Sequence, residues 1–106
     1  MDTVLMLKAL ADETRWEIIQ LLKCNNLCAC QLLDAFDISQ ATLSYHMRLL
    51  QEASLVQGIK EGYWTRYYLN KEHLAQLVYT FDELLEEVTV SSPPIQCSSK
   101  NNGKLR

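Results

Sequence analysis

DISQATLSYHMRLL, residues 37–50, predicts a helix that begins after a three-residue turn. Ser39 closes the turn, and its side chain is a good acceptor for the free backbone N–H groups of a helix start. Leu43, Met47 and Leu50 recur at the spacing of one helical face, so we expect a helix over 40–53 with this stripe in the core. The opposite face carries side chains that donate and accept hydrogen bonds, namely Gln40, Thr42, Ser44, Tyr45 and Arg48.

Three shorter helices are predicted upstream of this stretch. Residues 4–11 are apolar and end near Asp12, whose carboxylate is expected to cap a second helix that runs to about Lys23. Residues 25–26, both Asn, break this helix, because their side chains bond local backbone in turns. A short helix over 29–36 follows, so that helix, three-residue turn and helix stand in order.

The pattern changes to that of strands after the central helix. Residues 55–60 and 63–69 predict a two-stranded hairpin, with 61–62 as its turn because Gly62 can adopt a positive φ. A last helix is predicted over 71–88. Its apolar side is formed by Leu74, Leu77, Val78, Phe81, Leu84, Leu85 and Val88.

The first and last helices are too apolar along one side to be covered within one small domain. A homodimer that buries both of these sides is therefore expected. We place the folded domain, with its dimerisation surface, at residues 1–89 and a flexible C-terminal tail, rich in Ser, Pro and Asn, at 90–106.

The composition limits the classes of protein that remain. A chain of 106 residues, 48% hydrophobic and 22% charged, is enough for one globular domain. No apolar run is long enough to cross a membrane and the N-terminus lacks a secretory pattern, so we expect a cytoplasmic protein with reduced cysteines. The net charge of −3 lowers the expectation of nucleic-acid binding without excluding it, because binding depends on the local potential.

The order of the elements is that of a winged helix-turn-helix, a mainly α (α+β) fold with a two-stranded wing. In this fold the helix over 40–53 is the recognition helix, which enters a major groove. Four stretches resemble the ArsR/SmtB family of metal-responsive repressors, and they follow the family's order: LKALADETR (7–15), LCACQL (27–32), SQATLSYHM (39–47) and GYWTRYYL (62–69).

The resemblance implies a homodimeric repressor that binds operator double-stranded DNA and releases it when a thiophilic ion binds. The Cys-x-Cys variant resembles the branch that responds to arsenite or antimonite, As(III) or Sb(III), with sensors of Cd(II), Pb(II) and Zn(II) as neighbours. An enzyme is not expected, since the sequence has no Cys-x-x-Cys motif, no glycine-rich phosphate loop and no supported Ser/His/Asp arrangement.

Cys28 and Cys30 are the predicted metal ligands, because soft thiolates select soft ions. They begin a helix, where the positive end of the helix dipole favours the thiolate. Residues two apart do not face each other on a regular helix, so we expect the first turn to be distorted when one ion binds both sulfurs. The resemblance implies a third cysteine at the position of Leu33, and Cys24 and Cys97 remain as alternative third ligands.

Eight polar side chains are predicted to contact DNA. Gln40 can form two hydrogen bonds with adenine, and hydroxyl groups serve bases and phosphates alike. Arg48 on the helix, with Lys60 and Arg66 on the wing, should hold backbone phosphates, and His46 is expected to be packed or to face phosphate. The full set is Ser39, Gln40, Thr42, Ser44, Tyr45, Arg48, Lys60 and Arg66.

Two other interpretations of the same fold remain open. In the first, Cys28 and Cys30 oxidise rather than bind an ion, which would make the protein a thiol redox sensor. In the second, the winged helix binds a protein partner and never touches DNA, a role that the net charge of −3 would suit.

Overall fold

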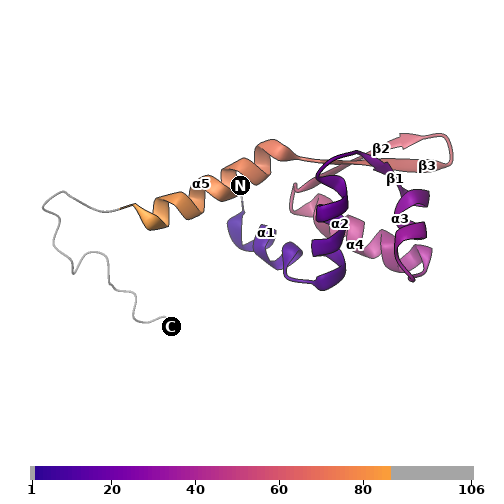
Figure 1. Ribbon diagram of the computed structural model, residues 1–106, viewed down its shortest axis with the longest axis horizontal. Coiled ribbons are helices and arrows are strands. Elements are labelled where there is room, and N and C mark those ends of the chain that lie inside the picture. The colour runs from indigo at the N-terminus through magenta and orange to yellow at the C-terminus, as the bar shows by residue number, and fades with distance from the viewer. Residues whose placement is uncertain (1, 87–106) are drawn as a thin grey trace, which may run out of the picture.

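The computed structural model describes residues 2–86. In this part of the chain, five helices and three strands follow one another in the order of a winged helix-turn-helix (Figure 1). The predicted mainly α architecture is confirmed. The elements are α1 (Thr3–Leu10), α2 (Glu13–Leu22), β1 (Leu27–Cys28), α3 (Ala29–Ala35), α4 (Gln40–Glu52), β2 (Val56–Glu61), β3 (Trp64–Leu69) and α5 (Lys71–Leu85).

Side-chain caps begin the helices at the predicted places. The Asp12 carboxylate accepts the Arg15 amide at 3.1 Å and starts α2, and Ser39 Oγ accepts the Thr42 amide at 3.1 Å and starts α4. Asn70 caps α5 in the same way. Each such cap typically contributes about 1 kcal/mol, so local chemistry fixes where these helices begin.

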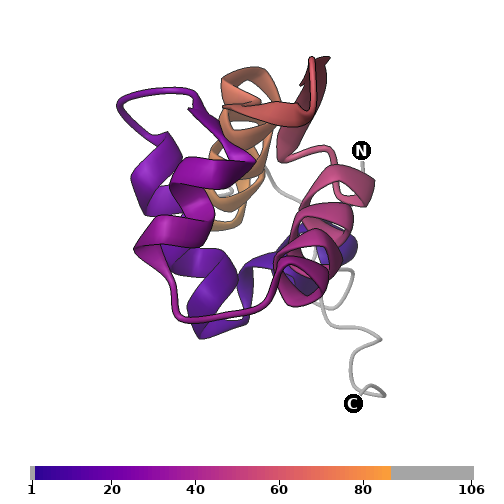
Figure 2. The same cartoon turned by 90° about the vertical axis from the view of Figure 1, so that its right-hand side faces the viewer.

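The core is formed by the inner faces of the helices and the start of the wing. In the end-on view of Figure 2 the helices flank this interior and the strands lie along its upper edge. The predicted stripe of α4 is buried, which confirms the orientation of that helix. The largest fully buried side chains are Met6, Ile18, Leu32, Leu43, Met47, Leu50 and Leu55.

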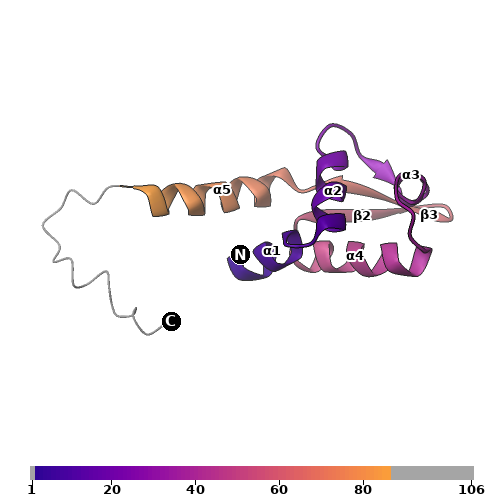
Figure 3. The ribbon, with the colours of Figure 1, turned by 60° about the horizontal axis from the view of Figure 1, so that its bottom comes forward.

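The sheet has one strand more than the sequence predicted. A two-stranded hairpin was expected, whereas in residues 2–86 the sheet has three antiparallel strands in the order β1-β3-β2 (Figure 3). β1 pairs with the middle strand, with Leu27 opposite Tyr67 and Cys28 opposite Arg66. Two residues are too few to show alternation, so the sequence gives no strand signal there. The extra strand therefore attaches Cys28 directly to the wing.

The wing turns at Gly62, but the two turn residues are 62–63 rather than the predicted 61–62, because Glu61 still belongs to β2. The φ of Gly62 is +62°, a conformation that glycine adopts without a steric penalty, and Glu61 pairs with Trp64 across the two-residue turn. Gly58 lies where β2 passes over α4 and β3. A Cβ atom at this position would lie 2.7 Å from Gln51 Oε1 and 2.9 Å from Tyr67 Cε1. Glycine therefore lets the wing approach the body closely.

α5 runs away from the rest of the molecule, as Figures 1 and 3 show. Leu77 near its middle is buried, but Leu84 and Leu85 at its end are 76% and 80% exposed. The helix ends at Leu85, short of the predicted end at Val88, and Glu86 follows it with an extended ψ of 133°. The predicted tail lies outside the described residues. None of the helices in residues 2–86 is long and apolar enough to cross a membrane.

Candidate functional site

The exposed face of α4 carries the side chains predicted to contact DNA. Gln40, Thr42, Ser44, Tyr45 and Arg48 are all exposed, on the side of the helix away from its buried stripe. Two exposed side chains interact with each other, since the Arg48 guanidinium lies 5.5 Å from the centroid of the Tyr45 ring. The face therefore offers hydroxyl, amide and guanidinium groups together, which is the chemistry that reads base edges and phosphates.

Ser39 is more constrained than the other predicted contacts. Its Oγ accepts the Thr42 amide and donates to Thr42 Oγ1 at 3.0 Å. The hydroxyl is thus committed to the start of α4. Its established part in the structure is to cap the helix that presents Gln40 and its neighbours.

His46 is packed rather than exposed, on the inner side of α4. It is 9% exposed, and its Nδ1 lies 3.0 Å from Arg15 Nη1 and 4.0 Å from the Asp12 carboxylate. Arg15 also donates from Nε to the Ala9 carbonyl at 2.7 Å. The hydrogen bond from the Arg15 amide, aided by the nearby Arg15 and His46 side chains, lowers the pKa of Asp12. This cluster ties α4 to the junction of α1 and α2.

The wing presents Lys60 and a residue that sequence reasoning missed. Lys60 is exposed on β2, close to the turn. Tyr63 occupies the second turn position and is 98% exposed, so it projects from the tip of the wing. The sequence analysis placed Tyr63 at the start of the second strand, and its position directly after Gly62 was the available signal that it lies in the turn. An exposed aromatic hydroxyl at a wing tip can reach a groove or a phosphate.

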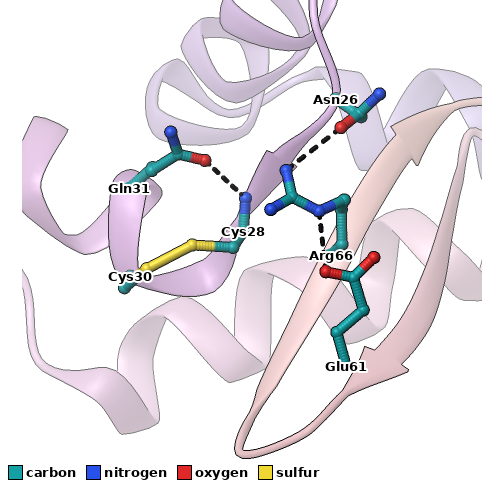
Figure 4. A network of polar contacts seen from close by, with 6 residues as sticks. All are labelled: Asn26, Cys28, Cys30, Gln31, Glu61 and Arg66. Atoms are coloured by element: carbon teal, nitrogen blue, oxygen red, sulfur yellow. Dashed lines mark hydrogen bonds and ion pairs between the residues drawn. A yellow bond between two sulfur atoms is a disulfide. The ribbon is translucent and has the colours of Figure 1, made fainter.

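Arg66 is already bonded within the protein. Its Nε donates to Glu61 Oε1 at 2.9 Å, and its Nη1 donates to Asn26 Oδ1 at 3.1 Å (Figure 4). The side chain is 30% exposed. The guanidinium that was predicted to hold a phosphate therefore links the loop before β1 to the end of β2.

Cys28 and Cys30 are brought together at a corner of the chain. Cys28 is the last residue of β1 and precedes α3 with extended backbone angles, φ −83° and ψ 161°, while Cys30 lies in the first turn of α3. Their Cα atoms are 5.4 Å apart, within the range that a disulfide spans. The backbone N–H of Cys28 is held by Gln31 Oε1 at 2.9 Å.

Two expectations about this pair are corrected. The cysteines were expected to remain thiols, but the structure joins Cys28 and Cys30 in a disulfide (Figure 4). The first turn of a helix was expected to be distorted so that both sulfurs could meet. Cys28 lies outside the helix instead, and the change of direction between β1 and α3 brings the sulfurs together without distortion of α3.

The third ligand is not assembled in the structure. Cys24 is exposed beyond the end of α2, beside a surface hollow of about 240 Å³ that Asn26 and Lys71 also line. No group of three or more His, Cys, Asp or Glu side chains in residues 2–86 is arranged to hold a metal ion. Cys97 lies outside the described residues. In the reduced state, Cys28 and Cys30 could present two neighbouring sulfurs to a soft ion, and a third sulfur would have to come from outside this pair.

The comparisons with known proteins agree with one another. Residues 12–57 match the family described as "Bacterial regulatory protein, arsR family". The chain is 38% identical over 99 residues to the "Arsenical resistance operon repressor" of Staphylococcus xylosus, covering 93% of this chain and 91% of that protein. It is 39% identical over 79 residues to a cadmium resistance regulatory protein, the CadC homolog of Staphylococcus aureus, covering 74% and 65% of the two chains.

A solved structure shares the fold. The crystal structure of a "Possible transcriptional regulator for arsenical resistance" superposes with a TM-score of 0.68 at 34% identity. The match covers 77% of this chain and 85% of the other. The family match over residues 12–57 includes the helix-turn-helix and the segment that carries Cys28 and Cys30.

Proposed function

Because this chain belongs to the ArsR family of bacterial regulatory proteins, we propose that it senses arsenite or antimonite through Cys28 and Cys30. Proteins of this family are metalloregulatory transcriptional repressors that bind operator DNA, and the chain is such a repressor rather than an enzyme. The observation that carries the proposal is the convergence of the two sulfurs at the corner between β1 and α3.

Ion binding at this corner is a ligand exchange without electron transfer. Arsenite at neutral pH is the acid As(OH)₃, and each thiol that binds replaces one hydroxyl group, which leaves as water. The cysteines must first be reduced, since a disulfide has no thiolate to offer. Two electrons and two protons from a pair of cellular thiols convert the Cys28–Cys30 disulfide into the dithiol and leave those thiols as a disulfide.

A third sulfur completes the preferred coordination of trivalent arsenic. Cys24 is four residues before Cys28 and is exposed, so movement of the intervening loop alone would bring it to the pair. Cys97 is the alternative, from the same chain or from a partner. The ions Cd(II), Pb(II) and Zn(II) are competing candidates, because thiolates bind them as well.

The DNA-binding surface that we propose combines α4 with the wing. Gln40, Thr42, Ser44 and Tyr45 would face base edges or phosphates, while Arg48 and Lys60 would hold phosphates, from the positions described above. Ser39 would act mainly through the helix start that it caps. Arg66 is left out of this surface, because its guanidinium is already bonded to Glu61 and Asn26.

We propose further that the repressor is a homodimer through α1 and α5. Apolar side chains on both helices are exposed to an extent unusual for a small domain, including Val4 on α1 and Val78, Phe81, Leu84 and Leu85 on α5. A two-fold dimer would place two copies of α4 about 34 Å apart, one turn of DNA. Residues 1–89 would then form the folded unit, with 90–106 as its tail.

The test is fluorescence anisotropy of the reduced protein on the DNA just upstream of its own gene. Arsenite, antimonite, cadmium, lead and zinc are added in turn. We expect salt-dependent binding that arsenite or antimonite reverses, and no reversal in Cys28→Ser or Cys30→Ser. Operator binding that ignores every ion would refute the proposed sensing function.

A redox function is the second candidate, and the disulfide between Cys28 and Cys30 favours it. Hydrogen peroxide would oxidise the two thiols to the disulfide while it is itself reduced to two molecules of water. The same anisotropy assay separates the two functions. Release by a peroxide but not by arsenite, reversed by a dithiol reductant, would establish the redox function instead.

A further inference from the structure

Arg66, on β3, joins two other segments of the chain to its own strand. Its guanidinium bonds Asn26 in the loop before β1 and Glu61 at the end of β2 (Figure 4). Both bonds are charge-assisted, because arginine carries a fixed positive charge and donates from a planar fork. The side chain is thus held in one orientation across the sheet.

The strand register places this arginine between the cysteines and the wing. Arg66 lies directly opposite Cys28 on one side and directly opposite Ile59 on the other. Residues directly opposite each other in a sheet project from the same face. Cys28, Arg66 and Ile59 therefore form a row across the three strands, and Glu61 is two residues beyond Ile59 on the outer strand.

We infer that Arg66 is a positioning residue that transmits the ligation state of the cysteine pair to the wing, an inference that rests on the proposed thiol function. Asn26 is separated from Cys28 by a single residue, and it lies inside the loop that must move if Cys24 joins the pair. A shift of this loop takes Asn26 away from Arg66. The guanidinium then loses one of its two side-chain partners and is held less firmly. Because Glu61 is bonded to this guanidinium, the end of the wing, where Lys60 and Tyr63 lie, is held less firmly too.

This role differs measurably from the phosphate contact that the sequence predicted for Arg66. Loss of one phosphate contact lowers the slope of log affinity against log salt by about 0.9 and weakens binding with or without the inducing ion. Loss of a coupling residue leaves that slope unchanged. It lowers the ratio between the operator affinities of the ion-free and the ion-bound protein.

The first experiment compares Asn26→Ala with its neighbour Asn25→Ala, a matched control whose side chain is not among those bonded to Arg66 in the described chain. Both reduced proteins are titrated onto operator DNA with and without arsenite. Coupling between two sites is typically about 5–150-fold, so the wild-type weakening should fall in that range. We expect Asn25→Ala to retain it. Asn26→Ala should lose about threefold or more of it, because its ion-free affinity falls toward the ion-bound value while its salt slope is unchanged.

Glu61→Gln provides a second route to the same network from the wing side. It weakens the other charge-assisted bond of Arg66 and should lower the coupling in the same direction. Equal coupling in wild type, Asn26→Ala and Glu61→Gln would overturn the inference. So would Arg66→Ala protein with intact coupling and a salt slope lowered by about 0.9, the signature of a phosphate contact.

A DNA-free readout follows the wing itself. The chain has two tryptophans, so Trp16→Phe leaves Trp64, opposite Glu61, as the single fluorescent reporter on the wing. Arsenite should change its emission in this background and leave it unchanged when Asn26→Ala is added. Protection of the thiols from a disulfide reagent confirms that both proteins still take up arsenite. A wild-type protein whose operator affinity ignores arsenite would overturn the proposed function, and this inference with it.

Discussion

Arg15 Nη1 lies 3.0 Å from His46 Nδ1, and this contact joins the first turn of α2 to the inner face of α4. Arginine can only donate, so Arg15 supplies the proton in this contact with the imidazole ring. The same arginine holds the Ala9 carbonyl at the end of α1. The Arg15 side chain therefore sets the position of α4 relative to α1 and α2.

Arg15→Ala should destabilise the protein by about 2 kcal/mol, because it leaves the buried His46 nitrogen and the Ala9 carbonyl without their donor. Urea unfolding followed by circular dichroism measures the change. Arg48→Ala is the matched control, since that arginine is exposed on α4 and its ion pair with Glu52 is exposed as well. Its effect should stay within about 0.5 kcal/mol, and equal losses in the two variants would contradict the role given to Arg15.

Acid should remove the stabilisation that Asp12 supplies. Its pKa is lowered in the folded state, mainly by the hydrogen bond from the Arg15 amide. A carboxyl with a depressed folded pKa adds stability that is complete above its unfolded pKa, about 3.9, and is lost as the pH falls through the folded value. Asn is also a good cap, so Asp12→Asn removes chiefly the charge. The difference in unfolding free energy between wild type and Asp12→Asn should be largest near pH 7 and shrink below about pH 4.

Lys60→Ala should weaken operator binding and lower its salt slope by about 0.9, as expected for one lost phosphate contact. The arsenite response of this variant should remain, because Lys60 is not bonded within the cysteine network. Anisotropy titrations at several salt concentrations supply both quantities. Lys23→Ala, an exposed lysine at the C-terminal end of α2, should change neither. A salt slope unaffected by Lys60→Ala would remove the wing from the proposed phosphate contacts.

Substitution of either glycine of the wing should destabilise the protein, but for different reasons. Gly58→Ala places a methyl group 2.9 Å from the Tyr67 ring and 2.7 Å from the Gln51 side chain, and such overpacking typically costs about 1–3 kcal/mol. Gly62→Ala meets open space, but its φ of +62° is unfavourable for alanine. Adding Gln51→Ala should recover only part of the Gly58→Ala loss, because Tyr67 stays in place. Gly62→Asn should be milder than Gly62→Ala, since Asn tolerates positive φ. Thermal unfolding of the four variants tests these differences.

Local chemistry made most of the fold predictable. The caps at Asp12 and Ser39, the buried stripe of α4 and the glycine turn of the wing depend on residues close in sequence, and each is confirmed. β1 was missed because two residues show no periodicity, and it exists only through its pairing with β3. The disulfide and the two partners of Arg66 also depend on contacts between segments far apart in sequence or on a corner that β1 creates. The candidate ligands could be named from the sequence, but their connection to the wing could not.

If the uncovered apolar side of α5 forms the proposed dimer interface, the concentration of the chain becomes part of its regulation. If two chains must meet before two recognition helices can occupy neighbouring grooves, then at low abundance the active species grows with the square of the chain concentration. A promoter under such control is nearly open while the repressor is scarce and closes over a narrow range of expression. If the repressor acts on its own promoter, this steep response would hold the concentration of the chain close to the value at which dimers begin to form. In such a dimer, the exposed leucines at the end of α5 would help set how many copies of the protein a cell maintains.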